Sequence, residues 1–268
     1  LSREDWRRSN IDRFVERMYR DIKASKPHVK VGISPFGIWR PEHPPGVKGM
    51  DAYDKLHADA RKWLREGWLD YVAPQLYWKI DAPQQPYGPL LDWWIGENVK
   101  GRAVWPGNFT SRLLPEAKSG WEAGEIAAQV EETRKREGAG GNIHFSAKAI
   151  TGNAAGVAEL LTKGVYAEAA LVPSMAWIDA KGPASPTVRV SGDAEVWVEF
   201  EPGSAEPARV WVVAVRSGSE SGGRWTVRIA PGGERRVRAT SVPGAIDAAA
   251  VWAVDRVGNM SEPAIWTR

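Results

Sequence analysis

Polar and aromatic side chains follow four segments that have the pattern of buried strands. The segments are Val29–Gly37, Asp70–Trp78, Arg102–Asn108 and Asn142–Lys148. Amide, hydroxyl and amino groups at strand ends can hydrogen-bond the hydroxyl groups of a sugar, and aromatic rings can stack on its apolar face. We expect Gln75 and Tyr77 to hydrogen-bond a sugar, and Trp39 and Trp78 to stack on it. Ser34 and Phe36 would form the floor of the site. Further hydrogen-bond donors around the mouth of the site would be Arg40, Asn108, Ser146 and Lys148.

The same side chains also fit a structural role. Gln75 and Ser146 could form an interior polar layer whose hydrogen bonds are satisfied within the protein. His144 stands early in its segment, which favours a position deeper in the fold than the mouth of a site. Trp63 lies at helical spacing from Leu56 and Ala60, so we expect it to pack rather than to bind a ligand.

Carboxylates are missing from the ends of the four segments. Cleavage of a glycosidic bond usually needs two carboxyl groups about 5 to 10 Å apart, one acting as acid and the other as base or nucleophile. Glu42, Asp81 and Glu116 lie in loops that could lean toward the site, but carboxylates in loops are more often solvated surface groups. The chain therefore shows no pair of catalytic carboxylates.

Other kinds of chemistry find little support. His28, His43, His57 and His144 have no metal-ligand spacing, and the chain has no cysteine, so we expect no metal site. No Ser-His-Asp arrangement, glycine-rich phosphate loop or dinucleotide fingerprint is present, and no cofactor is expected.

The charge pattern argues against nucleic acid as a partner. Lys and Arg number 36 against 33 Asp and Glu, and the basic residues form no clustered stripe. No apolar run approaches the roughly 20 residues that a membrane span requires. The chain starts at Leu1 without an initiator Met or a signal peptide, which suggests that a preceding segment was removed or not captured.

Helical patterns separate the four strand-like segments. Apolar residues recur from Ile11 to Ile22 after Ser9 and Asn10, a second helix runs from Asp51 to Gly67, and a long one covers Trp121–Glu137. Alternating strands and helices imply a parallel sheet with right-handed crossovers. A closed β/α barrel needs eight such units, so the pattern fits either a small open α/β sheet or half of a barrel.

The alternation of side chains along the strands favours the half barrel. Successive residues of a strand point to opposite faces. Polar side chains then share one face, whereas Ile33, Leu76, Ile143 and Phe145 are expected to face the helices. A doubly wound sheet would have two apolar faces. The predicted polar face carries Ser34 and Phe36, Gln75 and Tyr77, and His144, Ser146 and Lys148.

The composition changes after Trp177. Lys181–Thr187 reads as a linker, and several short segments with a period of two follow it, which predicts an all-β sandwich over residues 188–268. Exposure of Trp211 or Trp225 would favour carbohydrate binding by this domain, although a strand Trp is more often part of the core.

Four ordered runs carry a family resemblance. The runs are DWRRSN at Asp5–Asn10, VGISPFGIWR at Val31–Arg40, DYVAPQLYW at Asp70–Trp78 and IHFSAK at Ile143–Lys148. Together they resemble glycosyl-hydrolase-like family 10 over residues 1–180. The end of the chain, Val251–Ser261, resembles the closing hairpin of fibronectin type III-like modules.

The resemblance implies a specific architecture. Residues 1–180 would be strands five to eight of a (β/α)8 barrel, and an Asp-rich fourth strand carrying the main catalytic carboxylates would lie upstream of Leu1. It also implies a bacterial secreted or periplasmic glycosidase, acting on cell-envelope glycan such as peptidoglycan or on another polysaccharide. This chain would supply the substrate-binding half of the site and would hydrolyse weakly or not at all alone.

Two other functions stay open. A noncatalytic carbohydrate-binding protein fits the aromatic, carboxylate-poor strand ends, and an inert or self-associating remnant fits a truncated barrel. A half barrel leaves unpaired edge strands, here Val29–Phe36 and Asn142–Ala147, and an uncovered inner face. We therefore expect the chain to form a homodimer, to aggregate, or to need a missing N-terminal half.

Overall fold

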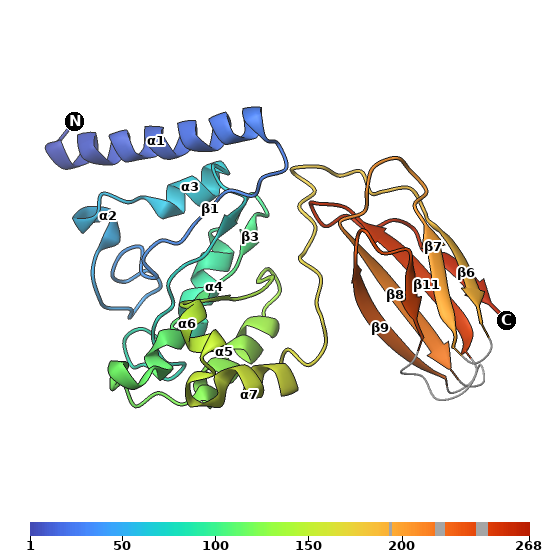
Figure 1. Cartoon of the computed structure of the whole chain (residues 1–268). Helices are drawn as coiled ribbons and strands as arrows, with labels where there is room; N and C mark the ends of the chain where they lie inside the picture. Colours follow the sequence, from blue (N-terminus) through green and yellow to red (C-terminus); the bar gives the residue numbers. More distant parts are fainter. Residues whose placement is uncertain (193–194, 218–222, 240–245) are drawn as a thin grey trace. The chain divides into compact units, whose positions relative to one another are not determined.

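The computed structural model describes residues 1–192, 195–217, 223–239 and 246–268. The chain divides into two compact units, Leu1–Ala170 and Leu171–Arg268. Helices and short parallel strands make up the first unit, and antiparallel strands make up the second (Figure 1). Within the described ranges, no helix combines the length and the apolar character needed to cross a membrane.

The first unit alternates strand segments with helices, as the sequence predicts. Its strands are much shorter than the predicted segments because only two residues of each form regular ladders. The elements are α1 (Arg3–Ser25), β1 (Gly32–Ile33), α2 (Ala52–Lys55), α3 (Ala60–Glu66), β2 (Tyr71–Val72), α4 (Tyr87–Gly96), β3 (Ala103–Val104), β4 (Gly107–Asn108), η1 (Thr110–Leu113), η2 (Pro115–Ala117), α5 (Ala123–Arg134), β5 (Ile143–His144), α6 (Ala147–Thr151), η3 (Ala154–Gly156) and α7 (Val157–Lys163).

Helix α1 begins earlier than the sequence predicts. The side chain of Ser2, not of Ser9 or Asn10, caps it by accepting a hydrogen bond from the Asp5 amide at 3.0 Å. Glu4 and Asp5 in the first turn complement the positive end of the helix dipole. The predicted helix from Asp51 to Gly67 is two helices, α2 and α3, because Asp59 starts a new cap at the Lys62 amide.

The parallel strands pair in chain order. β1 pairs with β2 and β2 with β3, in a ladder that aligns Gly32, Tyr71 and Ala103. Bridges from Gln75 to Phe36 and to Gly107 continue the same register, and β4 pairs with β5. The spatial order of the strands is the same as their order in the sequence, and helices connect them. The chain therefore winds in one direction across the sheet. The order lacks the reversal of a doubly wound sheet.

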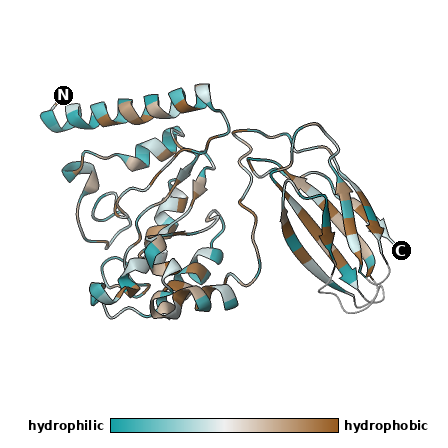
Figure 2. Cartoon of the chain, viewed as in Figure 1, coloured by the Kyte–Doolittle hydropathy of each residue, from teal (hydrophilic) through white to brown (hydrophobic). Residues whose placement is uncertain are grey.

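One face of this sheet is covered by helices. Val72 and Val104 are fully buried there, packed with Leu64 of α3, Leu90 and Trp94 of α4 and other members of the main core. Val15 of α1 belongs to the same core. Figure 2 colours the chain by hydropathy and shows hydrophobic stretches in the strands and in α4. The sheet is thus held from one side, and its other face is left to carry the side chains described below.

The second unit consists of two antiparallel sheets over one core. The three-stranded sheet has the order β10-β7-β6 and the four-stranded sheet the order β12-β11-β8-β9. Trp211 and Phe200, from different sheets, pack with ring centroids 4.9 Å apart. The strands are β6 (Thr187–Ser191), β7 (Trp197–Glu201), β8 (Val210–Ser217), β9 (Arg224–Pro231), β10 (Arg236–Arg238), β11 (Ile246–Val254) and β12 (Ala264–Thr267).

Residues ahead of the predicted linker belong to this second unit by their contacts. The Met175 amide donates to the carbonyl of Val257 at 3.1 Å, and the Asn259 side chain donates to the carbonyl of Asp179 at 2.9 Å. Of the range 188–268 that the sequence assigns to a sandwich, residues 193–194, 218–222 and 240–245 lie outside the described residues.

Candidate functional site

The carboxyl ends of the parallel strands place side chains in rows across the sheet. Phe36, Gln75, Gly107 and Ile143 form one row, since each pairs with the next. Two residues further along three of these segments stand Tyr77, Phe109 and Phe145. We call the face that carries these side chains the Tyr77 face, because it is opposite to the face that packs on the helices.

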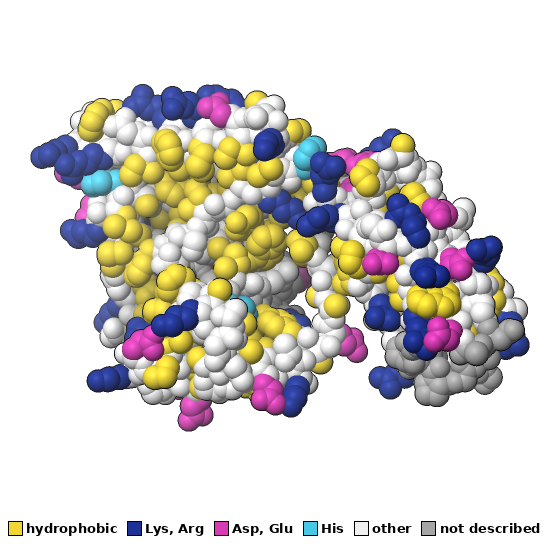
Figure 3. All heavy atoms as spheres, viewed as in Figure 1, with side chains coloured by type: hydrophobic (Ala, Val, Ile, Leu, Met, Phe, Trp, Pro, Cys, Tyr) yellow, Lys and Arg dark blue, Asp and Glu magenta, His cyan; other side chains and the backbone are white. Residues whose placement is uncertain are grey.

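Three aromatic rings meet at the end of the Tyr77 face. The Tyr77 ring centroid lies 4.5 Å from that of Phe109 and 5.8 Å from that of Phe145. Phe145 is 50% exposed, so the cluster is open on one side. Burial raises the pKa of Tyr77 above its ordinary value, so its hydroxyl is protonated at neutral pH, as that of an exposed tyrosine is, and can donate a hydrogen bond. Figure 3 shows hydrophobic side chains gathered over the first unit between α1 and α5–α7.

A second aromatic pair lies deeper on this face. Tyr71 stacks on Trp105 with ring centroids 4.7 Å apart. The Tyr71 ring lies over Gly32, where a Cβ atom would come within 2.2 Å of it, so a side chain there would displace the ring. Aromatic residues therefore follow β2, β3 and β4 on one side of the sheet.

A cavity of about 310 Å³ lies beside β1 and brings four predicted site residues together: Ser34, Phe36, Trp39 and Gln75. The Gln75 amide donates to the carbonyl of Ser34 at 3.0 Å, which fixes its orientation. Trp39 is only 8% exposed, because its ring stacks on Trp93 and its indole N–H donates to Asp59 at 3.0 Å. Most of the Trp39 ring is therefore used in packing.

Arg40 and Trp78 are also engaged with neighbouring groups. The Arg40 guanidinium donates from Nε to Asp51 at 3.0 Å and lies 4.7 Å from the centroid of the Tyr53 ring. Trp78 meets Phe36 edge to face at 5.7 Å. Both stay half-buried, so each has limited surface left for a ligand.

Asn108 does not lie at the mouth of the site, contrary to the sequence prediction. It is fully buried beneath α4 and α5, where its amide donates to Gln129 at 2.8 Å and to the Tyr87 hydroxyl at 3.2 Å. Its oxygen accepts from Asn142 at 2.9 Å. Burial raises the pKa of Tyr87 to about 12. Asn108 belongs to the helix-covered side because it directly follows Gly107, which faces Tyr77.

The last strand has the opposite alternation to the predicted one. His144 pairs with Asn108 on the helix-covered side, hydrogen-bonded to Thr110 and Tyr166 at 2.9 Å each. Ile143 and Phe145, expected against the helices, are 38% and 50% exposed. The reason is the register: the partner of Ile143 is Gly107, on the Tyr77 face.

Ser146 and Lys148 follow this strand at the start of a short helix rather than along a strand. The hydroxyl of Ser146 hydrogen-bonds that of Ser111 at 3.0 Å. Lys148 is exposed and donates to Glu116 at 2.6 Å. That hydrogen bond lowers the pKa of Glu116, so the carboxylate is ionised and paired with a cation.

The loop carboxylates do not converge on the Tyr77 face. Glu42 accepts from the Gly46 amide at 2.8 Å within its own loop, and Asp81 is exposed. The buried carboxylate Asp70 precedes β2 and is therefore at the opposite end of the strands, where it accepts from the Val31 amide at 2.8 Å and the Tyr19 hydroxyl at 3.0 Å. In the described ranges, no cluster of three or more His, Asp or Glu side chains could hold a metal ion.

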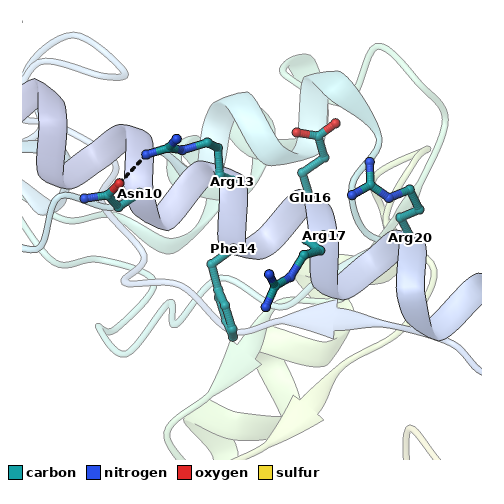
Figure 4. A pocket seen from close by; sticks show the side chains of 6 residues that line it. All are labelled: Asn10, Arg13, Phe14, Glu16, Arg17 and Arg20. Carbon is teal, nitrogen blue, oxygen red and sulfur yellow. Dashed lines mark hydrogen bonds between the residues drawn. The ribbon is translucent and has the colours of Figure 1, made fainter.

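A separate groove of about 520 Å³ runs along α1 (Figure 4). All six residues that line it come from this one helix. They are Asn10, Arg13, Phe14, Glu16, Arg17 and Arg20. Arg13 donates to Asn10, and Arg17 faces Asp21 at 3.9 Å. Side chains from a single exposed helix face do not enclose a ligand, so we place the candidate site on the Tyr77 face and the neighbouring cavity.

Comparison with known proteins gives a family likeness for the first part of the chain. Residues 2–106 match the family Glycosyl hydrolase-like 10. The matched stretch contains Ser34, Phe36, Gln75 and Tyr77, and it ends just before Phe109. The match, with the relatives below, supports the glycosyl hydrolase-like family for this part of the chain.

Two curated relatives extend the comparison. Glycosyl hydrolase YngK of Bacillus subtilis strain 168 is 39% identical over 191 residues, which is 68% of this chain and 37% of that protein. Glycosyl hydrolase DigH of Escherichia coli strain K12 is 41% identical over 97 residues, 35% of this chain and 22% of that protein. The chain thus spans little more than a third of the length of YngK, and less of DigH.

A solved chain described as a myokine structure overlaps with 32% of this chain and 97% of its own length, at 16% identity and a TM-score of 0.25. A similarity this low carries no argument about the fold.

Sequence reasoning missed Phe109 and Phe145 as members of the candidate site. The alternation of side chains contained a signal for both. Counting by two from Gly107 reaches Phe109, and counting by two from its partner Ile143 reaches Phe145. The register of the sheet determines which residue pairs with Gly107. This register cannot be derived from the sequence alone.

Proposed function

We propose that residues 1–170 are the C-terminal half of a (β/α)8 barrel and form the substrate-binding half of a glycoside hydrolase site. The strand order supports this, since four parallel segments pair in chain order with helices on one face. In a barrel of this kind the opposite face points inward, and ligands bind at the carboxyl ends of the strands.

The aromatic row of Tyr77, Phe109 and Phe145 carries the proposal. The row lies at the carboxyl ends of the strands and is partly exposed. It includes the protonated Tyr77 hydroxyl, and the preceding row of the same face includes the Gln75 amide. Rings supply apolar faces for pyranose C–H groups, and the polar groups fix the hydroxyls. This combination suits a glycan better than a charged metabolite.

The catalytic carboxylates of the proposed enzyme come from residues upstream of Leu1. The rows of the Tyr77 face contain no acidic residue: they read Gly32, Tyr71 and Ala103; Ser34, Ala73 and Trp105; Phe36, Gln75, Gly107 and Ile143; and Tyr77, Phe109 and Phe145. The chain spans 37% of YngK, which leaves room in a longer protein for a preceding half. Such a half, or a second copy of the chain, would cover the Tyr77 face.

The proposed substrate is a glycan of the bacterial cell envelope, such as peptidoglycan, with plant or storage polysaccharides as the rival class. The support is that both relatives are bacterial proteins named glycosyl hydrolases. A secreted or periplasmic location follows from this choice of substrate. The second unit would act as a fibronectin type III-like module.

A noncatalytic carbohydrate-binding protein is the second candidate. It is favoured by one observation, that the carboxylates Glu42 and Glu116 are hydrogen-bonded to the Gly46 amide and to Lys148 and do not converge on the Tyr77 face. Neither carboxylate is placed as one of an acid and base pair. In this reading the chain would hold a glycan without cleaving it.

One experiment separates the two candidates. The coding sequence is extended upstream of Leu1 in the source DNA, and the longer protein and this chain are assayed for release of reducing sugars from peptidoglycan strands and common polysaccharides. Hydrolysis by the longer protein only, abolished when its strand-end Asp residues are changed to Asn, supports the proposed enzyme. Binding by both without hydrolysis by either overturns it in favour of the binding protein.

A further inference from the structure

The two sheets of the second unit present outer faces of different character. On the three-stranded sheet, Arg189, Glu199 and Arg236 stand side by side in the ladder, and Arg189 pairs with Glu199. Charged residues in such a row are typical of a face that is in water. The four-stranded sheet has no such row of charges among its described residues.

An apolar row crosses all four strands of the larger sheet. Its members are successive ladder partners: Val227 of β9, Ala214 of β8, Ala250 of β11 and Ile265 of β12. The two alanines are 5% exposed each, whereas Val227 is 60% and Ile265 is 65% exposed. Small side chains in the middle and larger ones at both sides make a shallow trough. The exposed apolar surface of the row is therefore limited to its two sides.

A polar pair and an indole ring stand at one end of the trough. Trp225 is 45% exposed, and the guanidinium of its ladder partner Arg216 lies 5.5 Å from the ring centroid. Arg216 donates from Nε to Asp247 at 3.1 Å, and both side chains are about one quarter exposed. The indole ring can stack on a sugar, while the Arg–Asp pair offers both donors and acceptors to its hydroxyls.

The size of the trough argues against a second copy of the chain as its occupant. Eight residues of β8 at a rise of about 3.3 Å and three strand spacings of about 4.8 Å give the whole sheet face an area on the order of 400 Å², and its buried middle residues expose little of that. A stable protein–protein interface buries about 800 Å² on each partner. A single glycan chain needs less surface, and its ligand chemistry matches Trp225, Arg216 and Asp247.

We propose that this trough is a second glycan-binding surface, distinct from the Tyr77 face, with Trp225 as its stacking platform and the Arg216–Asp247 pair as its hydrogen-bonding group. The choice of a polysaccharide as ligand rests on the proposed function of the first unit. The surface itself rests on the arrangement of the second unit alone. It would bind an insoluble polymer without taking part in its cleavage.

The test compares Trp225→Ala with Trp197→Ala in the full chain. Trp197 is a matched control, because it lies on the outer face of the three-stranded sheet with the Arg236 guanidinium 4.5 Å from its ring centroid. Cosedimentation with purified peptidoglycan sacculi and with insoluble chitin gives the dissociation constant. We expect Trp225→Ala to weaken binding about 5-fold, as the loss of one stacked ring does, and Trp197→Ala to leave it unchanged.

A conservative variant shows whether the indole acts by stacking. Trp225→Phe keeps an aromatic face and should restore most of the binding, and thermal unfolding of all variants identifies any loss of folding. Binding that is equal for the wild-type chain and Trp225→Ala overturns the proposal, as does an equal loss in Trp197→Ala. A dimer in light scattering that Trp225→Ala dissociates also overturns it, because a second copy would then occupy the trough.

The failure of this proposal can be told apart from that of the first. If Tyr77→Ala weakens glycan binding and Trp225→Ala does not, the trough is not a binding surface and the proposed function stands. If only Trp225→Ala weakens binding, the second unit binds glycan and the proposed role of the Tyr77 face is lost.

Discussion

The Tyr77 ring lies 4.5 Å from the Phe109 ring, which joins the ends of two neighbouring strand segments. The constant register of the sheet brings the two side chains to the same level, since Gln75 pairs with Gly107 two residues before each of them. Phe145 adds the third ring from the next segment. An aromatic surface at the strand ends thus comes from three separate parts of the chain.

The first prediction concerns the Tyr77 ring. Tyr77→Ala should weaken binding of a soluble glycan about 5-fold in the longer protein, because a stacked ring contributes roughly 1 kcal/mol. Tyr77→Phe should lose less, since it keeps the ring and removes only the hydroxyl. Isothermal titration with oligosaccharides measures both. Phe14→Ala, at a 60% exposed ring on α1, is the control and should leave affinity unchanged; equal affinity of Tyr77→Ala and the unaltered protein would remove Tyr77 from the site.

The second prediction concerns Asn108, which is structural. Asn108→Ala leaves the Gln129 oxygen without its donor and Asn142 without one acceptor. The free energy of unfolding should fall by about 2 kcal/mol, and Tm by about 6 °C. Glycan affinity of the folded protein should not change, because Asn108 lies under α4 and α5. Differential scanning calorimetry and titration at a temperature below both transitions check this, and a normal Tm with lost affinity would return Asn108 to the site.

The contrast between Gln75 and Asn108 shows what the sequence can predict about the site. The strand ends, the helix-covered Leu76 and the polar side of Gln75 follow from alternation along one segment. Asn108 was misplaced because its partners Tyr87 and Gln129 are each 21 residues away, in helices whose polar residues carry no signal of burial. Polar side chains buried in a network look like surface residues in a sequence.

The fold was predictable to a similar depth. Alternation of strands and helices predicted the parallel sheet, and period-two segments predicted antiparallel strands in the second unit. Trp211 and Trp225 illustrate the limit: they have the same local pattern, yet Trp211 is fully buried and Trp225 is 45% exposed. Their facing depends on which side of β8 and β9 meets the other sheet, which is a tertiary property.

The third prediction concerns the pH dependence of stability. Burial lowers the pKa of His144 below its ordinary value of about 6.5, so the folded protein holds a neutral imidazole between Thr110 and Tyr166. The unfolded chain therefore binds the proton more readily than the folded one. The stability that His144 provides is fully present above about pH 6.5 and is lost as the pH falls toward the lower folded pKa.

Thermal unfolding of three proteins across this pH range checks the third prediction. The Tm of the unaltered chain should fall more than that of His144→Gln between about pH 7 and pH 5, since the variant has no titratable group at position 144. His28→Gln is the control, at a position before β1 for which no such burial exists. Parallel pH profiles of the chain and His144→Gln would show that His144 does not contribute.

The last prediction concerns the uncovered Tyr77 face. Ile143 and Phe145 are 38% and 50% exposed, and β5 pairs only with β4 within the described ladders. If this face normally packs against another half barrel, the isolated chain should self-associate, because exposed apolar side chains beside an open strand edge attract a second copy. Sedimentation velocity at increasing protein concentration should show a rising average mass.

The double variant Ile143→Ser, Phe145→Ser should reduce that mass, whereas Trp225→Ala in the second unit should not. A concentration-independent monomer with a cooperative melt would contradict the half barrel and favour a complete open sheet, since a face that needs a partner would not stay unpaired in solution.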